Sequence, residues 1–211
     1  MLRILIADDH PIVRQGLGQL IAKTADMVVA DEASNGLEVL SKARASHCDV
    51  VLLDISMPGL HGLDIIRQLK KESPKVPILV LSMHSEEQYA VRAFRAGASG
   101  YLTKQSAPDE LLAAIRKVSI GGKYVSSSLA EKLASDLEIG AGKLPHETLS
   151  NREYQVMLMI AGGKTVAEIA EVLSLSVQTI STYRSRILQK MQMKNNVELA
   201  NYAIRNQLLD Q

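Results

Sequence analysis

Arg3-Ile4-Leu5-Ile6-Ala7-Asp8-Asp9 is a largely apolar run that ends in two carboxylates. It is the first of five short apolar runs along the chain. Amphipathic stretches of about 10 to 14 residues, a length typical of crossover helices, separate the runs. This alternation is the pattern of repeated βα units, in which helices cover both faces of a parallel sheet. We therefore predict an α/β domain with a doubly wound five-stranded parallel sheet, its strands at Arg3–Ala7, Met27–Asp31, Val50–Leu53, Ile78–Leu81 and Gly100–Leu102.

The character of the sequence changes after residue 119. Gly121-Gly122, three consecutive serines and Gly140-Ala141-Gly142 interrupt one short amphipathic piece at residues 129–137, as is typical of a linker. Four helical segments are predicted beyond it, near residues 150–162, 165–173, 176–191 and 195–208, and a Ser150/Glu153 capping box opens the first. The predicted organisation is a domain at residues 1–120, a linker at 121–146 and a second, smaller all-α domain at 147–211.

The composition excludes several classes of protein. With 46% apolar and 22% charged side chains, the 211 residues are typical of a globular chain rather than a disordered or fibrous one. No run approaches the ~18 uncharged apolar residues of a membrane span, and Asp8-Asp9 interrupts the N-terminus before a signal-peptide core develops, so we expect a cytoplasmic protein with no membrane partner. Cys48 is the single cysteine, which rules out an internal disulfide and a paired-cysteine zinc site.

Chemically active side chains follow four of the predicted strands. Asp8, Asp9 and Asp54 lie at the ends of the first and third, Ser82 ends the fourth, and Lys104 follows the fifth. In parallel α/β sheets, ligands bind at the carboxyl ends of the strands. Three converging carboxylates call for a compensating cation, most naturally Mg²⁺, and the added hydroxyl and ammonium suit phosphoryl transfer. Asp54 is the predicted nucleophile, although any one of these residues alone is more typical of a helix cap or turn.

A helix-turn-helix pattern is predicted in the second domain. A short helix with an apolar stripe, a corner at Ser174–Val177 and a longer helix follow one another, and residues 176–195 carry four basic and no acidic side chains, although the net charge of the chain is only +1. On a helical wheel the core-facing residues are Val177, Ile180, Ile187, Leu188 and Met191. From this pattern alone, DNA binding and binding of another protein are equally good interpretations.

Polar residues on the opposite face of the longer helix, together with residues near it that could contact phosphates, are the candidate DNA contacts. Those that could contact base edges are Gln178, Ser181, Thr182, Ser185 and Arg186. Those that could contact the phosphate backbone are Lys164, Thr179 and Lys190. The five histidines are scattered over separate loops without the spacing of metal ligands, and we expect surface or packing roles for them.

The first domain resembles the receiver domain of two-component response regulators, a flavodoxin-like fold. The residues that carry the resemblance are Ile4-Leu5-Ile6-Ala7-Asp8-Asp9-His10-Pro11, Asp54-Ile55-Ser56-Met57-Pro58-Gly59-Leu60-His61-Gly62 and Tyr101-Leu102-Thr103-Lys104. The resemblance implies that Asp54 accepts a phosphoryl group from a sensor histidine kinase. It further implies that Mg²⁺ is held by Asp8, Asp9, Asp54 and the backbone carbonyl of Ser56, that Ser82 and Lys104 contact the phosphoryl oxygens, and that Tyr101 is a switch residue.

The second domain resembles the LuxR-type DNA-binding domain, which decides between the two interpretations of the helical pattern. The matching segments are Leu149–Glu153, Gly162–Thr165, Glu168–Ala170 and Ser176–Ile187. Together the two halves resemble the NarL/FixJ class of response regulators over essentially the whole chain. Ser181 departs from the lysine that many relatives carry there. The class usually binds DNA as a dimer, and Leu199, Ala200, Ala203 and Ile204 of the last helix could form a partner surface, although closing the domain core is the simpler role for most of them.

The resemblance implies a regulator rather than an enzyme: phosphorylation of Asp54 controls dimerisation and sequence-specific binding to double-stranded promoter DNA, and so transcription. Two other functions remain open at this point. The chain could be a DNA-binding regulator that is always active, with a vestigial acidic pocket, but the pocket residues form an intact set. A Mg²⁺-dependent phosphohydrolase is disfavoured because the position two residues after Asp54 is Ser56 rather than a second acid.

Overall fold

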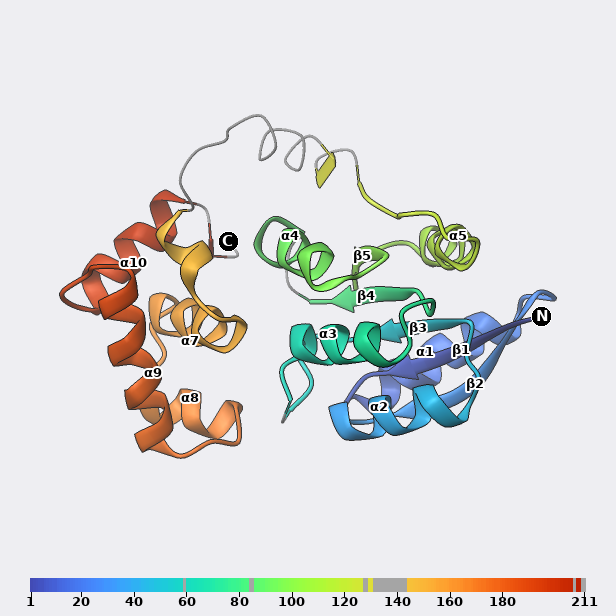
Figure 1. Cartoon of the computed structure of the whole chain (residues 1–211), viewed down its shortest axis with the longest axis horizontal. Helices are drawn as coiled ribbons and strands as arrows, with labels where there is room; N and C mark the ends of the chain where they lie inside the picture. Colours follow the sequence, from blue (N-terminus) through green and yellow to red (C-terminus); the bar gives the residue numbers. More distant parts are fainter. Residues whose placement is uncertain (59, 84–85, 127–128, 131–143, 207, 210–211) are drawn as a thin grey trace. The chain divides into compact units, whose positions relative to one another are not determined.

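The computed structural model of the chain describes residues 1–58, 60–83, 86–126, 129–130, 144–206 and 208–209 (Figure 1). The chain divides into two compact units, Met1–Ser135 and Asp136–Gln211. Only residues 129–130 of the predicted amphipathic piece at 129–137 fall within the described ranges. No helix in those ranges is long and apolar enough to cross a membrane.

The first unit alternates strands and helices from its first residue, as predicted. Its five strands pair in the order β2-β1-β3-β4-β5, and every pair is parallel. The strands are β1 (Leu2–Ala7), β2 (Met27–Ala33), β3 (Val50–Leu53), β4 (Ile78–Ser82) and β5 (Gly100–Thr103). The helices are α1 (Pro11–Ala22), α2 (Gly36–Ala45), α3 (Gly62–Glu72), α4 (Glu86–Ala96) and α5 (Pro108–Ser119). The predicted doubly wound α/β fold is confirmed.

Helices lie on both faces of the sheet (Figure 1). Because successive strand residues point to opposite faces, Ile4 and Ile6 pack with α1 and α5, whereas Leu5 turns to the other side. Strands β1, β3 and β4 are buried almost throughout, which matches their apolar sequences. β2 is the exception, because it lies at the sheet edge and its middle residues are only partly covered.

The described residues of the second unit are helical and contain no strand. They form a 3₁₀ turn, η1 (Pro145–Thr148), and four helices, α7 (Asn151–Ala161), α8 (Val166–Val172), α9 (Val177–Lys190) and α10 (Asn196–Arg205). A polar side chain at each N-cap, such as Ser150 for α7 and Ser176 for α9, accepts a hydrogen bond from a backbone N–H in the first turn. These caps satisfy amide groups that have no partner inside the helix, so they fix where each helix begins.

The core of the second unit is formed by the apolar faces that the sequence predicted, with one correction. Ile180 and Ile187 are fully buried on α9, and Leu199 and Ala203 are fully buried on α10. Val177, which the helical wheel placed in the core, is 53% exposed. Val177 is the first residue of α9. No earlier turn of α9 is present to cover its side chain.

Candidate metal centre and nucleic-acid interface

The carboxyl edge of the sheet brings the predicted acidic residues together. β1 and β3 are neighbours, with Ala7 opposite Leu53, so Asp8 and Asp54 leave adjacent strands at the same level. The backbone N–H of Asp54 donates to the carbonyl of Ala7 at 2.8 Å. Both side chains are 2% exposed. The topology therefore accounts for the convergence of carboxylates that are 46 residues apart in the sequence.

Lys104 completes this cluster from the far side of β4. Its Nζ lies 2.6 Å from Asp8 Oδ2 and 2.6 Å from Asp54 Oδ2. Its backbone N–H donates to the carbonyl of Ser82 at 2.8 Å, which fixes the end of β5 beside the end of β4. The Lys104 side chain is only 9% exposed, so one ammonium group lies between two buried carboxylates.

Burial and ion pairing act in opposite directions on these groups. Burial raises the pKa of Asp54, and the hydrogen bonds from Lys104 and from the Ser56 N–H (2.8 Å, to Oδ1) only partly offset this. Burial would lower the pKa of Lys104, but the hydrogen bonds to Asp54 and Asp8 together outweigh it, so its pKa is raised. Lys104 therefore remains an ammonium ion and compensates the negative charge of the site.

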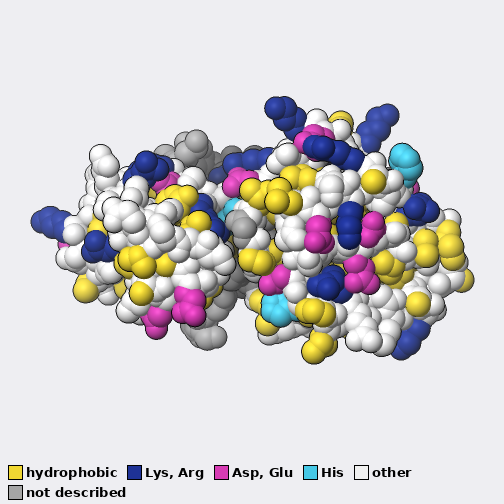
Figure 2. Space-filling model, turned by 90° about the horizontal axis from the view of Figure 1, so that it is seen from below, with side chains coloured by type: hydrophobic (Ala, Val, Ile, Leu, Met, Phe, Trp, Pro, Cys, Tyr) yellow, Lys and Arg dark blue, Asp and Glu magenta, His cyan; other side chains and the backbone are white. Residues whose placement is uncertain are grey.

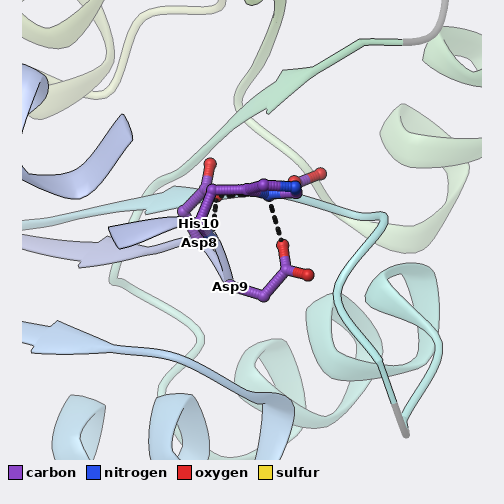
Figure 3. A group of neighbouring side chains, drawn as sticks. Asp8, Asp9 and His10 are labelled. Atoms are coloured by element: carbon purple, nitrogen blue, oxygen red, sulfur yellow. Dashed lines mark hydrogen bonds and ion pairs between the residues drawn. The ribbon is translucent and has the colours of Figure 1, made fainter. Parts of the chain in front are cut away.

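Asp9 and His10 form the outer part of the cluster (Figure 3). The Nδ1 atom of His10 lies 2.9 Å from Asp9 Oδ1 and 3.3 Å from Asp8 Oδ1, and the His10 backbone N–H donates to Asp8 Oδ1 at 2.9 Å. Sequence reasoning gave His10 only a surface or packing role. Its adjacency to Asp8-Asp9, just before α1, was the signal that could have placed it here.

The donor atoms of this group fit a divalent cation. One ligand atom each from Asp8, Asp9, His10 and Asp54 lies within 4.8 Å of the others. Asp9 Oδ1 is buried, and among the described residues its contact is with His10 Nδ1 at 2.9 Å. Three carboxylates are the hard oxygen donors that Mg²⁺ prefers.

Ser82 and Tyr101 lie on the two strands beyond Asp54. Ser82 is the last residue of β4 and is fully buried. Tyr101 is fully buried on β5, opposite Val80. Ser56 lies in the loop after β3, where its N–H bond to Asp54 holds that loop against the carboxylate.

His61 has a structural role, in line with the packing role expected for it from the sequence. It is buried, and its Nδ1 accepts a hydrogen bond from the Leu63 N–H at 3.2 Å as the N-cap of α3.

A helix-turn-helix is present in the second unit. α8 ends at Val172, Ser174 adopts a left-handed conformation with φ of 52°, and α9 begins at Val177. Arg152 fastens α7 to the corner, because it donates to the carbonyl of Leu173 at 3.2 Å. The predicted short helix, tight corner and longer helix are therefore all observed.

Most of the predicted DNA-contacting side chains are exposed. Thr179 and Ser181 are partly buried, and the exposed ones are Lys164, Gln178, Thr182, Ser185, Arg186 and Lys190. The hydroxyl groups of Thr182 and Ser185 donate to carbonyls one turn earlier, at 3.0 and 3.1 Å. They are thus left with acceptor lone pairs for an outside partner.

Lys190 is already paired within the unit. Its Nζ lies 2.6 Å from Glu153 Oε2, and the Glu153 side chain is only 4% exposed. Glu153 also accepts from the Ser150 N–H at 2.8 Å in the α7 capping box. Lys190 therefore joins the end of α9 to the start of α7, a role that sequence reasoning did not assign to it.

Charges of both signs are mixed on the protein surface. Figure 2 shows acidic and basic side chains interspersed over one face of the molecule, as expected for a net charge of +1. The candidate nucleic-acid interface therefore depends on particular side chains of α9 and its surroundings rather than on overall charge.

Two family models match the chain, one for each unit. Residues 4–116 match the response regulator receiver domain, and residues 147–203 match the luxR family of bacterial regulatory proteins. Response regulator UvrY of Escherichia coli O6:H1 is 40% identical over 209 residues, which covers 99% of this chain and 96% of the relative. Response regulator GacA of Pseudomonas viridiflava is 38% identical over 211 residues, covering 100% of this chain and 99% of the relative.

Solved structures show the same similarity. RcsB from Salmonella enterica serovar Typhimurium, bound to promoter rprA in the presence of phosphomimetic BeF3-, is similar with a TM-score of 0.65 and 28% identity, over 96% of this chain and 98% of that one. A LuxR-family two-component response regulator from Aurantimonas sp. SI85-9A1 has a TM-score of 0.59 and 36% identity, over 64% of this chain and 96% of that one. The similarity therefore covers both units.

Proposed function

Because this chain belongs to the NarL/FixJ class of two-component response regulators, which regulate transcription through a receiver domain and a LuxR-type DNA-binding domain, we propose that phosphorylation of Asp54 controls its binding to DNA. A sensor histidine kinase is the proposed phosphoryl donor and double-stranded promoter DNA the proposed target. The proposed receiver is residues 1–120, the linker 121–146 and the DNA-binding domain 147–211. The proposed place of action is the cytoplasm, where the DNA is.

Mg²⁺ is the proposed cofactor. Asp8, Asp9, Asp54 and the backbone carbonyl of Ser56 would hold it, and the gathering of carboxylate oxygens from the three aspartates within 4.8 Å of one another supports this assignment. When bound, the ion would neutralise negative charge on the phosphoryl oxygens.

Asp54 would act as the nucleophile. A carboxylate oxygen forms a bond to phosphorus while the bond between phosphorus and the kinase histidine nitrogen breaks, and that nitrogen keeps the electron pair. The Ser56 N–H holds Asp54 Oδ1 at 2.8 Å, so the carboxylate is oriented before the donor arrives. Lys104 would move from its position between the carboxylates to the phosphoryl oxygens, and the Ser82 hydroxyl would donate to one of them.

The observation that carries the proposal is the position of Lys104 Nζ, 2.6 Å from an oxygen of both Asp8 and Asp54. A cation held between the nucleophile and a second acid is what transfer of an anionic group to a carboxylate requires. Burying an ammonium group and two carboxylates costs desolvation free energy, and this argues against a vestigial pocket.

Phosphorylation would be transmitted through α4, β5 and α5. The new phosphoryl group carries about −1.5 to −2 charge in place of the single negative charge of the carboxylate, and it draws Ser82 and Lys104 toward it. Because the Lys104 N–H is bonded to the carbonyl of Ser82, the two strand ends would move together. Tyr101, buried three residues before Lys104, is the proposed switch side chain.

In the second unit α9 is the proposed recognition helix, lying in the DNA major groove. Exposure supports Gln178, Thr182, Ser185 and Arg186 as base contacts and Lys164 as a phosphate contact. Ser181, Thr179 and Lys190 stay in the proposed interface, with Lys190 held by Glu153 as it contacts the backbone. A homodimer is the proposed DNA-binding form when the protein is phosphorylated. Val197 and Ile204 of α10, 68% and 63% exposed, are candidates for its surface.

The experiment that tests this function measures DNA binding with and without phosphorylation. Wild type would first select a duplex from a random pool after treatment with acetyl phosphate and Mg²⁺. We expect wild type to bind the selected duplex more tightly when phosphorylated, and Asp54→Ala to fold and bind without that gain. An equal gain in Asp54→Ala, or binding by wild type that phosphorylation does not change, would overturn the proposal.

A further inference from the structure

The segment that follows α5 is attached to the outer side of β5. The backbone N–H of Tyr124 donates to the carbonyl of Ser99 at 2.9 Å, and Tyr124 forms a parallel bridge with Gly100. β5 is the last strand of the sheet, so this pairing extends the sheet by one short contact. The predicted linker therefore begins as part of the receiver fold.

The Tyr124 side chain joins the same segment to α5. Its hydroxyl donates to Glu110 Oε1 at 2.9 Å, and the Nζ of Lys117 lies 5.7 Å from its ring centroid. Glu110 is in the first turn of α5 and Lys117 is in the last turn. One aromatic side chain thus contacts both ends of the helix.

Lys123 contacts α4 and the turn that follows it. Its Nζ donates to the carbonyl of Ala98 at 2.8 Å and lies 5.9 Å from the ring centroid of Phe94. Two consecutive residues, Lys123 and Tyr124, therefore contact α4, β5 and α5 together. These are the elements through which phosphorylation is proposed to act.

The residue at position 100 permits this attachment. A Cβ on Gly100 would lie 2.9 Å from Tyr124 Cβ and 3.1 Å from the Tyr124 carbonyl oxygen, so a larger side chain would push the segment off β5. Gly100 directly precedes Tyr101, the proposed switch residue. A shift of β5 at Tyr101 thus moves the backbone that Tyr124 is paired with.

We propose that Tyr124 is a positioning residue that couples the phosphorylated receiver to the DNA-binding unit by fixing the start of the linker to β5 and α5. This inference rests on the proposed function. A signal can pass between two sites only through a physical element whose states both sites bias. The covalent path to the second unit passes through Tyr124, so a shift of β5 and α5 reaches that path through the Ser99, Gly100 and Glu110 contacts.

The test uses the full chain and compares four proteins: wild type, Tyr124→Ala, Tyr124→Phe and Asp109→Asn. Tyr124→Phe keeps the ring and the backbone pairing but loses the bond to Glu110. Asp109→Asn is the matched control, because it changes the acid next to Glu110 in the same helical turn. Phosphorylation at Asp54 is followed by intact mass, and affinity for the selected duplex is measured with and without acetyl phosphate.

We expect all four proteins to be phosphorylated equally. Allosteric coupling typically changes affinity about 5- to 150-fold. The gain in DNA affinity on phosphorylation should fall toward about onefold in Tyr124→Ala and take an intermediate value in Tyr124→Phe. It should stay at the wild-type value in Asp109→Asn. A purely structural role for Tyr124 would lower the melting temperature, yet leave the ratio of phosphorylated to unphosphorylated affinity unchanged.

If Tyr124→Phe and a folded Tyr124→Ala both gain as much DNA affinity on phosphorylation as wild type, the inference is overturned. The proposed function then stays in place. If Tyr124→Ala does not fold, Tyr124→Phe decides alone, and an undiminished gain there overturns the inference. Absence of any gain in wild type overturns the proposed function, and the coupling with it.

Discussion

Lys104 Nζ lies 2.6 Å from Asp54 Oδ2 although the two residues follow strands separated by β4. The same ammonium lies 2.6 Å from Asp8 Oδ2. One buried cation thus compensates two buried carboxylates, and its removal takes the ammonium away from both. The relationship makes the stability of the receiver depend on the charge within its site.

Lys104→Met should therefore destabilise the receiver, by about 3 to 5 kcal/mol as for a broken buried pair. Mg²⁺ should restore part of that loss, because a divalent cation supplies the missing charge. Urea unfolding with and without Mg²⁺ measures both effects. The control is Lys42→Met, which removes a lysine paired with Asp31 on the surface and should cost at most about 1 kcal/mol. A Lys104→Met protein as stable as wild type without Mg²⁺ would show that the pair does not matter to stability.

Gly62→Ala should destabilise the receiver strongly. A Cβ at Gly62 would collide with Ile55 Cα and lie 2.7 Å from the Ile55 carbonyl oxygen, which is backbone that cannot turn aside. The loop after Asp54 would have to shift, and a cost of about 1 to 3 kcal/mol or more is expected from such overpacking. Thermal unfolding measures it.

Gly16→Ala is the matched control for that substitution. Gly16 lies inside α1, and apart from its own helix backbone no atom lies within 4 Å of the position a Cβ would take, so alanine there should stabilise the protein by about 0.5 to 1 kcal/mol. Opposite signs for the two variants are predicted. If both lower the melting temperature equally, close packing at Gly62 is not the cause.

Glu153 should make the second unit sensitive to acid. Burial would raise the pKa of this carboxyl, but the hydrogen bonds from Lys190 and Ser150 together outweigh burial and lower it. A lowered folded-state pKa means that the stabilising contribution is complete above the ordinary glutamate pKa of about 4.3 and is lost as the pH falls through the folded-state value. Glu153→Gln should cost about 1 to 3 kcal/mol at neutral pH and progressively less in acid.

Hydrogen exchange at the amides of α7 and α9 measures this difference in the full chain. Glu171→Gln, which changes an exposed glutamate of α8, is the control and should behave as wild type at each pH. A Glu153→Gln defect that persists undiminished in acid would mean that the charge of Glu153 is not responsible.

Arg186→Ala and Lys164→Ala should weaken DNA binding in different ways. Loss of a base contact at Arg186 is expected to cost about 1 to 3 kcal/mol of DNA-binding free energy and to relax sequence preference. Loss of a phosphate contact at Lys164 should reduce the slope of log affinity against log salt concentration by about one, without changing sequence preference. Binding to selected and scrambled duplexes over a salt series measures both, and phosphorylation of Asp54 should be unaffected. Unchanged preference in Arg186→Ala would exclude it as a base contact.

The fold could be predicted from sequence because its signals are local. Each strand is a short apolar run and each helix of the second unit begins at a capping residue such as Ser150 or Ser176, so neither needs knowledge of distant neighbours. The convergence of Asp8 and Asp54 was also predictable, since parallel strands present their carboxyl ends at one edge.

Features that depend on a distant partner could not be predicted in this way. The Glu153–Lys190 pair joins residues that are 37 positions apart on two helices, and nothing local to Lys190 distinguishes it from a solvent-facing lysine. Tyr124 lies among residues whose glycines and serines are typical of a linker, and its contacts with the distant Gly100 and Glu110 show that the receiver extends to it. The prediction for Val177 was wrong because a helical wheel gives only the direction in which a residue points, and at the first residue of α9 that direction does not ensure burial.

The most direct test of the account is the intact mass of the protein after incubation with acetyl phosphate and Mg²⁺. We predict that wild type gains a single labile phosphoryl group, which is absent when Mg²⁺ is omitted and absent in Asp54→Ala. The same adduct on Asp54→Ala, or no adduct on wild type with Mg²⁺ present, would contradict the assignment of Asp54 as the phosphorylated residue.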